Sequence, residues 1–270
     1  MTDDTKPRRI NGLSYPWHKL QIATWIIVPL LKVHYFAYLM PIIWDYLVCQ
    51  ILLTVFFCLA GGSSILCGYL TCSIDPADNS LCGIQQPQNS TSTIYCYICE
   101  SNVDNSAKHC RYCEKCVVRF DHHCKWLNTC IGQKNYPYFL VVVCAVGLET
   151  TISLALSIAY VIEIFAFPDN IMMRVNKNKL LLDNSGIIGI SIASVVILLP
   201  LVGLVYQLIG FHATLLYNKQ TTYEFIVQEQ KKARERENVQ RAPPSSNNKV
   251  SGSKNSFEIV ATEEMVPTGA

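Results

Sequence analysis

Four long apolar stretches constrain this chain most, because a helix needs about 20 mostly apolar residues to cross a bilayer. They lie at about 21–43, 46–71, 138–167 and 186–217. Only 16% of the residues are charged, against roughly a quarter in average soluble proteins. The sequence therefore predicts an all-α polytopic membrane protein with four transmembrane helices.

Three acidic or basic residues interrupt these stretches. Lys32 lies in the first, and Glu149 and Glu163 lie in the third. Charges inside a membrane are often functional, but long side chains also reach the interface or pair with other helices. Both readings stay open for Lys32 and Glu163, and the sequence assigns no role to Glu149.

The distribution of Lys and Arg predicts the topology. At most three residues, 44–46, separate the first two stretches, which implies a tight hairpin. The N-terminal segment, the 72–137 loop and the tail hold 18 Lys and Arg residues, whereas the segment between the third and fourth stretches holds three. The positive side should face the cytosol, so the glycosylation sequon at Asn89 should stay unmodified.

The 72–137 loop is rich in cysteine, and seven of the 13 cysteines lie between Cys96 and Cys130. Disulfides are disfavoured in the reducing cytosol, so clustered Cys and His indicate metal binding. Two CxxC pairs, Cys96/Cys99 and Cys110/Cys113, have the spacing that aims two thiolates at one tetrahedral ion. The candidate ligands are Cys96, Cys99, His109, Cys110, Cys113, Cys116, His122, His123, Cys124 and Cys130.

The number of candidate ligands carries the next inference. A structural zinc takes four protein ligands, so ten candidates fill two Cys₃His sites and leave one Cys and one His. A spare thiol beside a spare imidazole is the minimum for a nucleophilic cysteine. Spacing does not say which residues are spare, although 121–124 is the tightest cluster. The alternative is that all four of these residues serve the zinc scaffold.

Asp121-His122-His123-Cys124 in this spacing resembles the DHHC family of protein S-acyltransferases, often called palmitoyltransferases. The four-span layout and the whole loop fit the resemblance. Asp75-Pro76 matches the start of the family's Asp-Pro-Gly motif, and residues 221–224 match its Thr-Thr-x-Glu motif. Ala77 and Lys125 depart from the common pattern, which leaves the turn at the membrane side open. Further matching positions are Asn128, Cys130, Gly132, Asn135, Tyr136 and Phe139.

The resemblance implies a role for each site residue. Cys124 would be the nucleophile, His122 the base and Asp121 the group that orients the imidazole, with Asp75 and Thr222 in support. It also implies two interleaved sets of ligands for two structural Zn²⁺ ions. One set is Cys96, Cys99, His109 and Cys116, and the other is Cys110, Cys113, His123 and Cys130.

The implied activity is protein S-palmitoyltransfer. A palmitoyl or other long-chain acyl group would move from acyl-CoA to Cys124, and then to cysteines of membrane-associated proteins. The family also implies an endomembrane location, the endoplasmic reticulum or the Golgi. Two competing hypotheses are a non-catalytic zinc-stapled membrane scaffold and a membrane-anchored RING-like ligase. The ligase is disfavoured because Cys116 and Cys130 occur singly after Cys113 rather than as a closing CxxC pair.

The sequence also predicts a division of the chain. Residues 1–71 would hold the N-terminal segment and the first two spans, and 72–137 the zinc module. Residues 138–217 would hold the last two spans, and 218–270 a tail. We expect a capping box at Thr221 and Glu224 to open a helix, and the tail from Arg241 to be disordered.

Overall fold

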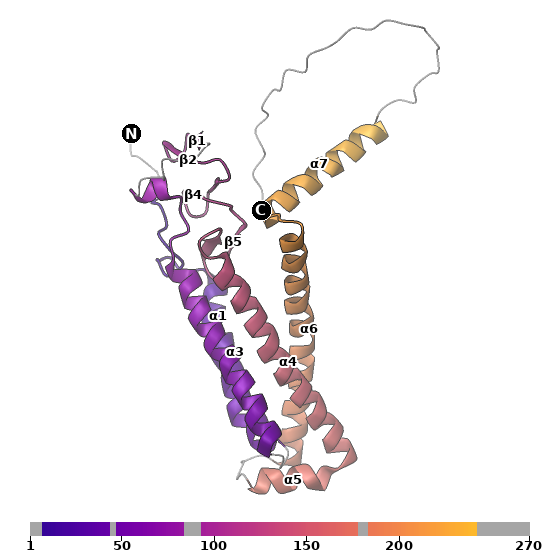
Figure 1. Ribbon diagram of the computed structural model, residues 1–270. Coiled ribbons are helices and arrows are strands. Elements are labelled where there is room, and N and C mark those ends of the chain that lie inside the picture. Colours follow the sequence, from indigo (N-terminus) through magenta and orange to yellow (C-terminus); the bar gives the residue numbers. More distant parts are fainter. Residues whose placement is uncertain (1–6, 44–46, 84–92, 178–182, 242–270) are drawn as a thin grey trace, which may run out of the picture. The chain divides into compact units, whose positions relative to one another are not determined.

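The protein is represented by a computed structural model that describes residues 7–43, 47–83, 93–177 and 183–241 (Figure 1). The chain divides into two units, 1–228 and 229–270, and everything below concerns the first unless stated otherwise. The 44–46 hairpin, Asn89 and the tail after Arg241 lie outside the described residues, so the expectations for them stay predictions.

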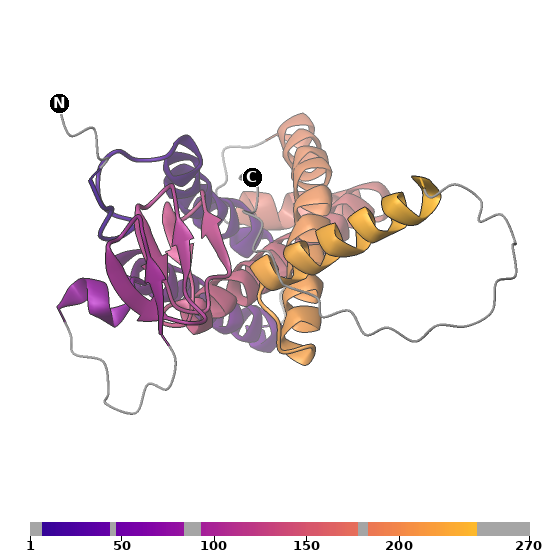
Figure 2. The same ribbon diagram turned by 90° about the horizontal axis from the view of Figure 1, so that it is seen from above.

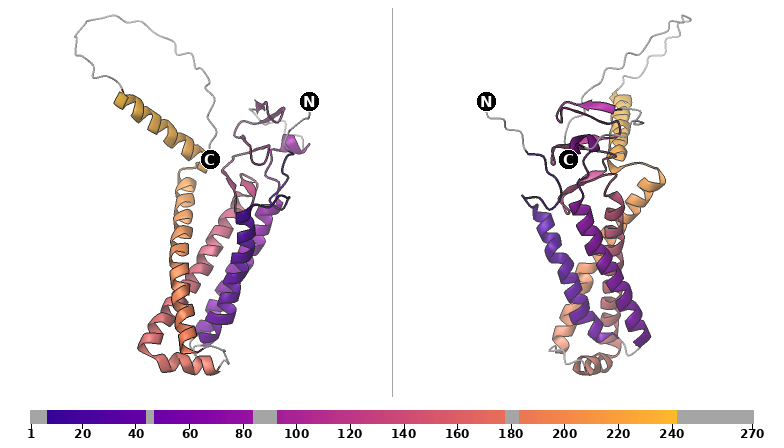
Figure 3. Two further views of the ribbon diagram at one scale, coloured as in Figure 1. Left: turned by 180° about the vertical axis from the view of Figure 1, so that it is seen from behind. Right: turned by 60° about the vertical axis from the view of Figure 1, so that its left-hand side comes forward.

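Among the residues that the structure describes, four helices are long and apolar enough to cross a membrane, as the sequence predicts. The first span is continuous from α1 (Lys19–His34) through the π-helical turn η1 (Tyr35–Leu39) to α2 (Met40–Ile42). The other three are α3 (Leu47–Ser73), α4 (Tyr136–Ala166) and α6 (Asn184–Tyr217). A short helix α5 (Pro168–Lys177) lies at the end of the helices opposite to the strands (Figures 1 and 3).

Helix α4 packs against both α3 and α6 and lies between them in Figure 1. Thr150, Ser153 and Ser157 are fully buried on it. Each hydroxyl donates to a carbonyl four residues earlier, at 2.7–2.9 Å. Small residues whose polar atoms are satisfied within their own helix let neighbouring membrane helices approach closely.

Lys32, Glu149 and Glu163, the charged residues inside the first and third apolar stretches, all have partners. Lys32 forms an ion pair with the fully buried Glu149, and Ser64 Oγ lies 3.5 Å from the other carboxylate oxygen. A Cβ at Gly61 would lie 2.7 Å from Glu149 Oε1, so the pair fits because α3 has a glycine there. Glu163 pairs with Arg174 of α5. These contacts favour the helix-pairing interpretation of Lys32 and Glu163.

The described part of the loop between α3 and α4 forms three antiparallel hairpins, a detail that the prediction of an all-α chain did not include. The first pairs β1 (Thr93–Cys96) with β2 (Ser101–Asp104), and the second pairs β3 (Lys108–Cys110) with β4 (Lys115–Val117). The third pairs β5 (His122–Cys124) with β6 (Thr129–Ile131). Figures 1 and 2 show the strands at the end of the helices where α1 begins and α3 ends.

Each hairpin reverses through a residue with positive φ. These are Glu100 (48°), Glu114 (47°) and Asn128 (53°). Glu100 and Glu114 directly follow the second cysteine of a CxxC pair, so the left-handed residue turns the chain back after both sulfurs have been placed. After α6 the chain enters the next helix, α7 (Thr222–Arg241), where the sequence predicts a capped helix.

Candidate metal centres and active site

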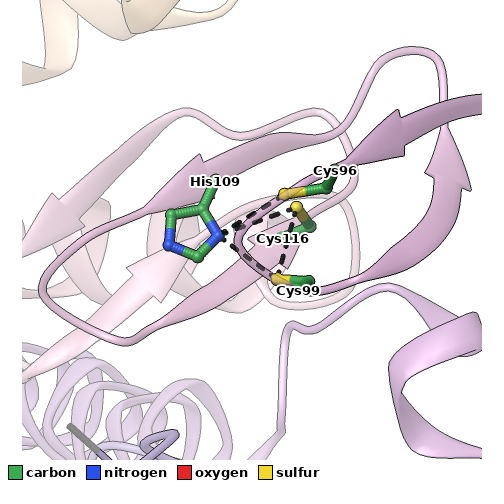
Figure 4. A group of neighbouring side chains, drawn as sticks. All are labelled: Cys96, Cys99, His109 and Cys116. Atoms are coloured by element: carbon green, nitrogen blue, oxygen red, sulfur yellow. Dashed lines mark hydrogen bonds between the residues drawn. The ribbon is translucent and has the colours of Figure 1, made fainter. Parts of the chain in front are cut away.

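The first cluster consists of Cys96, Cys99, His109 and Cys116, whose ligand atoms all lie within 4.8 Å of one another. Figure 4 shows the His109 ring pointing Nδ1 toward the three sulfurs, at 3.2–3.9 Å. The sulfurs of Cys99 and Cys116 are 3.8 Å apart. Two thiolates bound at about 2.3 Å to a tetrahedral zinc lie roughly 3.8 Å apart, so this donor set fits zinc.

The second cluster consists of Cys110, Cys113, His123 and Cys130, also within 4.8 Å of one another. His123 Nδ1 lies 3.4 Å from the sulfur of Cys113 and 3.7 Å from that of Cys130. All three cysteines are buried. Three thiols and one imidazole with this spacing again fit a closed structural zinc site.

The two clusters share one hairpin, β3–β4. The β3–β4 pairing sets His109 directly opposite Cys116, and the β5–β6 pairing sets His123 opposite Cys130. Cys110, at the end of β3, belongs to the second cluster although its strand neighbour His109 belongs to the first. A metal in the first cluster would therefore tie the β1–β2 hairpin to β3–β4, and a metal in the second would tie β3–β4 to β5–β6.

Each metal-facing histidine has a second contact that orients its ring. His109 Nε2 lies 3.3 Å from Glu114 Oε2, and Tyr112 stacks on His123 with ring centroids 4.9 Å apart. Lys125 Nζ lies over the Tyr112 ring, 5.8 Å from its centroid. Lys125, which departs from the common family pattern, thus contacts the ring that stacks on His123. Such outer contacts fix ligand orientation at metal sites.

His122 and Cys124 belong to neither cluster. Successive side chains of a strand point to opposite faces, so His122 and Cys124 share one face of β5 while His123 takes the other. Counting ligands does not show which Cys and which His lie outside the zinc sites. The strand geometry favours Cys124 and His122, the pair that the family resemblance implies.

Asp121 holds the His122 ring, with Oδ2 2.6 Å from Nδ1. Thr222 donates to both oxygens of the same carboxylate, from its backbone N–H to Oδ1 and from Oγ1 to Oδ2, each at 2.8 Å. Burial opposes the charged form of Asp121, but the hydrogen bonds from His122 and Thr222 outweigh it and lower the pKa of the carboxyl. Asp121 is therefore an ionised, fixed partner for the imidazole.

Thr222 is positioned by the predicted capping box at the start of α7. The Thr221 N–H donates to Glu224 Oε2 at 2.8 Å, and the Glu224 N–H donates to Thr221 Oγ1 at 3.2 Å. The N-terminus of a helix favours negative charge nearby. The capped end of α7 thus adds to the stabilisation of the Asp121 carboxylate.

His122 experiences opposing influences. Burial lowers the pKa of its imidazole, but hydrogen bonds with Asp121 and Cys124, together with their charges, raise it to about 9. An imidazolium is therefore well stabilised beside the Cys124 sulfur. That is the arrangement by which a histidine activates a cysteine nucleophile.

Cys124 itself is buried in an apolar cluster that joins the third hairpin to the membrane helices. The cluster includes Cys72 of α3, Leu127 of the hairpin, and Phe139 and Val143 of α4. Val205 and Ile209 of α6 pack against it. The thiol therefore lies where the hairpin meets the ends of three spans.

Asp75, just after α3, braces the module. It accepts from Lys115 Nζ at 2.7 Å, from Arg8 Nη2 at 2.6 Å and from the Ala77 N–H at 3.0 Å. Burial opposes the carboxylate, but these partners, Lys115 first, lower the pKa of Asp75. Ala77 is buried and bridges to Val117 of β4. An alanine fits there because its φ is not positive.

Other residues of the family pattern tie the third hairpin to α3. Asn135 is buried, and its side chain donates to the carbonyls of Thr71 (3.2 Å) and Cys130 (2.9 Å). Its Oδ1 accepts from the Gly132 N–H at 3.0 Å. A Cβ at Gly132 would collide with Val117, so only glycine fits this approach.

Two further features of the site were not predicted from the sequence. The N-terminal segment lies across the module, where the Arg9 N–H donates to the Cys113 carbonyl (3.0 Å) and the Gly12 N–H to that of Cys72 (2.7 Å). His212 of α6 is buried beside His122. The one sequence signal for His212 is a histidine near the end of a largely apolar span. The N-terminal segment shows no periodic pattern of apolar residues.

The fold and the site together define a class of protein: a four-span membrane protein with a two-metal cysteine-rich module and a Cys-His-Asp set outside the metal clusters. Residues 89–229, slightly more than half of the chain, match the sequence profile of the DHHC palmitoyltransferase family. The chain belongs to this family.

Three curated relatives are similar to most of the chain. Palmitoyltransferase ZDHHC1 of Mus musculus is 33% identical over 254 residues, which cover 82% of this chain and 51% of the relative. ZDHHC1 of Homo sapiens is also 33% identical over 254 residues, covering 82% and 50%. Palmitoyltransferase ZDHHC11 of Homo sapiens is 27% identical over 271 residues, covering 87% and 63%. The chain thus spans about half the length of the first two.

Proposed function

We propose that this chain is a protein S-acyltransferase that moves a palmitoyl or similar long-chain acyl group from acyl-CoA to cysteines of other proteins. Cys124 carries the acyl group between the two steps. The observation that carries the proposal is a thiol outside both metal clusters, on the same strand face as His122, whose Nδ1 is held by Asp121. Membership of the DHHC palmitoyltransferase family supports it.

In the first step Cys124 attacks the thioester carbonyl of acyl-CoA. Because Nδ1 of His122 is bonded to Asp121, Nε2 is left to take the thiol proton. The new C–S bond to Cys124 forms, the C–S bond to CoA breaks, and the proton passes from His122 to the departing CoA sulfur. Asp121 stays ionised and stabilises the imidazolium in between.

In the second step the thiol of a target cysteine gives its proton to His122 and attacks the acyl-Cys124 carbonyl. The Cys124 sulfur leaves and takes that proton back. A thioester is exchanged for a thioester in both steps, so no ATP is needed. What the protein supplies is the alignment of the reacting atoms and the exclusion of water from the acyl-enzyme.

The two Zn²⁺ ions are structural in this proposal, and they neutralise thiolates and cross-link the hairpins. One would be held by Cys96, Cys99, His109 and Cys116, and the other by Cys110, Cys113, His123 and Cys130. Thr222 supports the site through Asp121, and Asp75 supports the module through Lys115. No reaction step involves either metal.

The apolar surroundings of Cys124 suit an acyl donor. Burying each methylene contributes about 0.8 kcal/mol, and the apolar cluster at Cys124 continues into the ends of α3, α4 and α6. The CoA head would remain in the cytosol while the acyl chain lies among the spans. The other partners would be membrane-associated proteins with cytosolic cysteines.

We place the protein in an endomembrane, the endoplasmic reticulum or the Golgi, with both termini and the module in the cytosol. The bias of Lys and Arg toward that side supports the topology. The division into 1–71, 72–137, 138–217 and 218–270 belongs to the same proposal. The ends of the described spans, Ser73 of α3 and Tyr136 of α4, fall close to these limits.

The proposal is tested by transfer to an acceptor. Purified full-length chain is incubated with radiolabelled palmitoyl-CoA and a membrane-anchored peptide with one cysteine, beside a Cys124→Ser variant. We expect hydroxylamine-sensitive label on the peptide with the unmodified chain and none with the variant. Equal labelling by both would disprove a role for Cys124. No labelling by folded, zinc-loaded protein would favour the non-catalytic scaffold.

A further inference from the structure

His212 is a buried histidine that the proposed reaction does not use. It lies near the end of α6 and is 3% exposed. Its ring centroid is 6.2 Å from that of His122, with the two planes 43° apart. Its neighbours Phe211, Ala213 and Leu215 in the helix are apolar, so a buried polar ring here calls for a physical reason.

Tyr136, the first residue of α4, is the hydrogen-bond partner of His212. The Tyr136 hydroxyl lies 3.1 Å from His212 Nδ1. This bond satisfies a ring nitrogen that would be costly to bury without a partner. It joins α4 to α6 and fixes the orientation of the His212 ring.

Phe139, one turn after Tyr136 on α4, lies edge-on to both imidazoles. Its centroid is 5.3 Å from His122 and 5.1 Å from His212, at 70° in each case. Residues three apart on a helix share a face, so Tyr136 and Phe139 both point toward the histidines. The His122 ring is thus held by Asp121 at one nitrogen and flanked by Phe139 and His212.

The hydrogen bonds of His122 with Asp121 and Cys124 leave its side chain some freedom to shift, and the flanking rings limit that shift. We propose that His212, locked by Tyr136, is a positioning residue for His122 and keeps Nε2 aimed at the Cys124 sulfur. This inference rests on the proposed function, because His122 is the base in that reaction. A misplacement of about 1 Å at a reacting group costs on the order of 100-fold in rate.

The test compares three variants of the full-length chain in the formation of acyl-Cys124 from palmitoyl-CoA. Tyr136→Phe removes only the hydroxyl, His212→Phe keeps a ring of similar size without the hydrogen bond, and the third variant combines both. We expect each single variant to lower kcat by about tenfold, a partial misplacement on that scale, with KM for palmitoyl-CoA unchanged. The combined variant should be no slower than the slower single variant, because both changes break one bond.

Tyr206→Phe is the matched control. It also removes a tyrosine hydroxyl between α6 and α4, where Thr151 donates to Tyr206 at 3.1 Å, but it does so at a different pair of residues. We expect its kcat to equal that of the unmodified chain. An equal loss in this control, or multiplicative losses in the combined variant, would mean general loosening of the helices and would overturn the inference.

The two hypotheses fail differently. If the unmodified chain forms no acyl-Cys124, the proposed function fails. If it does, and Tyr136→Phe and His212→Phe react within twofold of its rate, only the positioning role of His212 fails. Zinc content measured on every variant shows that the module is intact. Should His212→Phe lose zinc, Tyr136→Phe alone decides the question, because it removes a single oxygen.

Discussion

The ion pair between Lys32 and Glu149 should contribute much of the stability with which the first span packs against the third. In Lys32→Met, the Glu149 carboxylate, whose side chain is 1% exposed, keeps the contact with Ser64 Oγ as its only polar contact with a described side chain. Removing one partner of a buried pair costs about 3–5 kcal/mol, whereas replacing both by apolar residues of similar volume is often neutral. The total stability of a typical domain is about 5–15 kcal/mol, so the single change should be severe.

We therefore expect Lys32→Met to lower the unfolding free energy by about 3–5 kcal/mol, and Lys32→Met combined with Glu149→Met to recover most of that loss. The assay is reversible unfolding of the purified chain in mixed micelles with increasing SDS, followed by circular dichroism. Lys232→Met, which breaks the exposed pair with Glu229 on α7, is the control and should leave the midpoint unchanged. A single variant as stable as the unmodified chain, or a double variant as unstable as the single, would refute this reasoning.

Three further predictions concern the module and the site. His122→Ala should retain two zinc ions per chain while His123→Ala loses one, because only His123 faces a metal cluster; elemental analysis showing the reverse would overturn the division of the motif. Asp75→Ala should destabilise the chain by about 3 kcal/mol in thermal unfolding, because the buried Lys115 ammonium loses its carboxylate partner while its hydrogen bond to the Ile10 carbonyl remains. Its hydrogen-bond partners lower the pKa of Asp75 in the folded chain, so its contribution to stability is present above the unfolded pKa of about 3.9 and is lost as the pH falls through the lower folded pKa. The stability lost in Asp75→Ala should therefore shrink in acid, and a loss that grows in acid would contradict the assignment. Thr222→Val removes the donor to Asp121 Oδ2 and should slow formation of acyl-Cys124 several-fold with zinc retained, whereas an unchanged rate in stopped-flow labelling would show that the backbone donor suffices.

Hydropathy was enough to predict the four spans to within a few residues, because the length of a bilayer-crossing helix is set by the membrane itself. Counting ligands predicted two metal clusters, since structural zinc takes four ligands in a fixed geometry. The members of both clusters agree with those that the family resemblance implies. Local chemistry also predicted the capping box at Thr221 and Glu224, which depends only on neighbours along the chain.

Contacts between residues far apart along the chain could not be predicted from the sequence. The ion pair of Lys32 with Glu149 depends on the packing of α1, α3 and α4, and on a glycine at position 61. The opposite faces of His122 and His123 depend on a strand of three residues, too short to show a periodic pattern. His212 reaches the site only because α6 packs against α4. The N-terminal segment meets the module partly through backbone groups, which leave no trace in residue type, and partly through the ion pair of Arg8 with Asp75, whose partner lies far away along the chain.

The central claim is that Cys124 carries the acyl group while eight other Cys and His residues hold metal. The most direct measurement is peptide mapping by mass spectrometry of full-length chain after brief incubation with palmitoyl-CoA and no acceptor, with zinc quantified on the same sample. We predict one hydroxylamine-sensitive palmitoyl group, on the peptide that contains Cys124, together with two zinc ions per chain. Stable palmitoylation at another cysteine with Cys124 unmodified, or loss of zinc as Cys124 becomes acylated, would contradict the account.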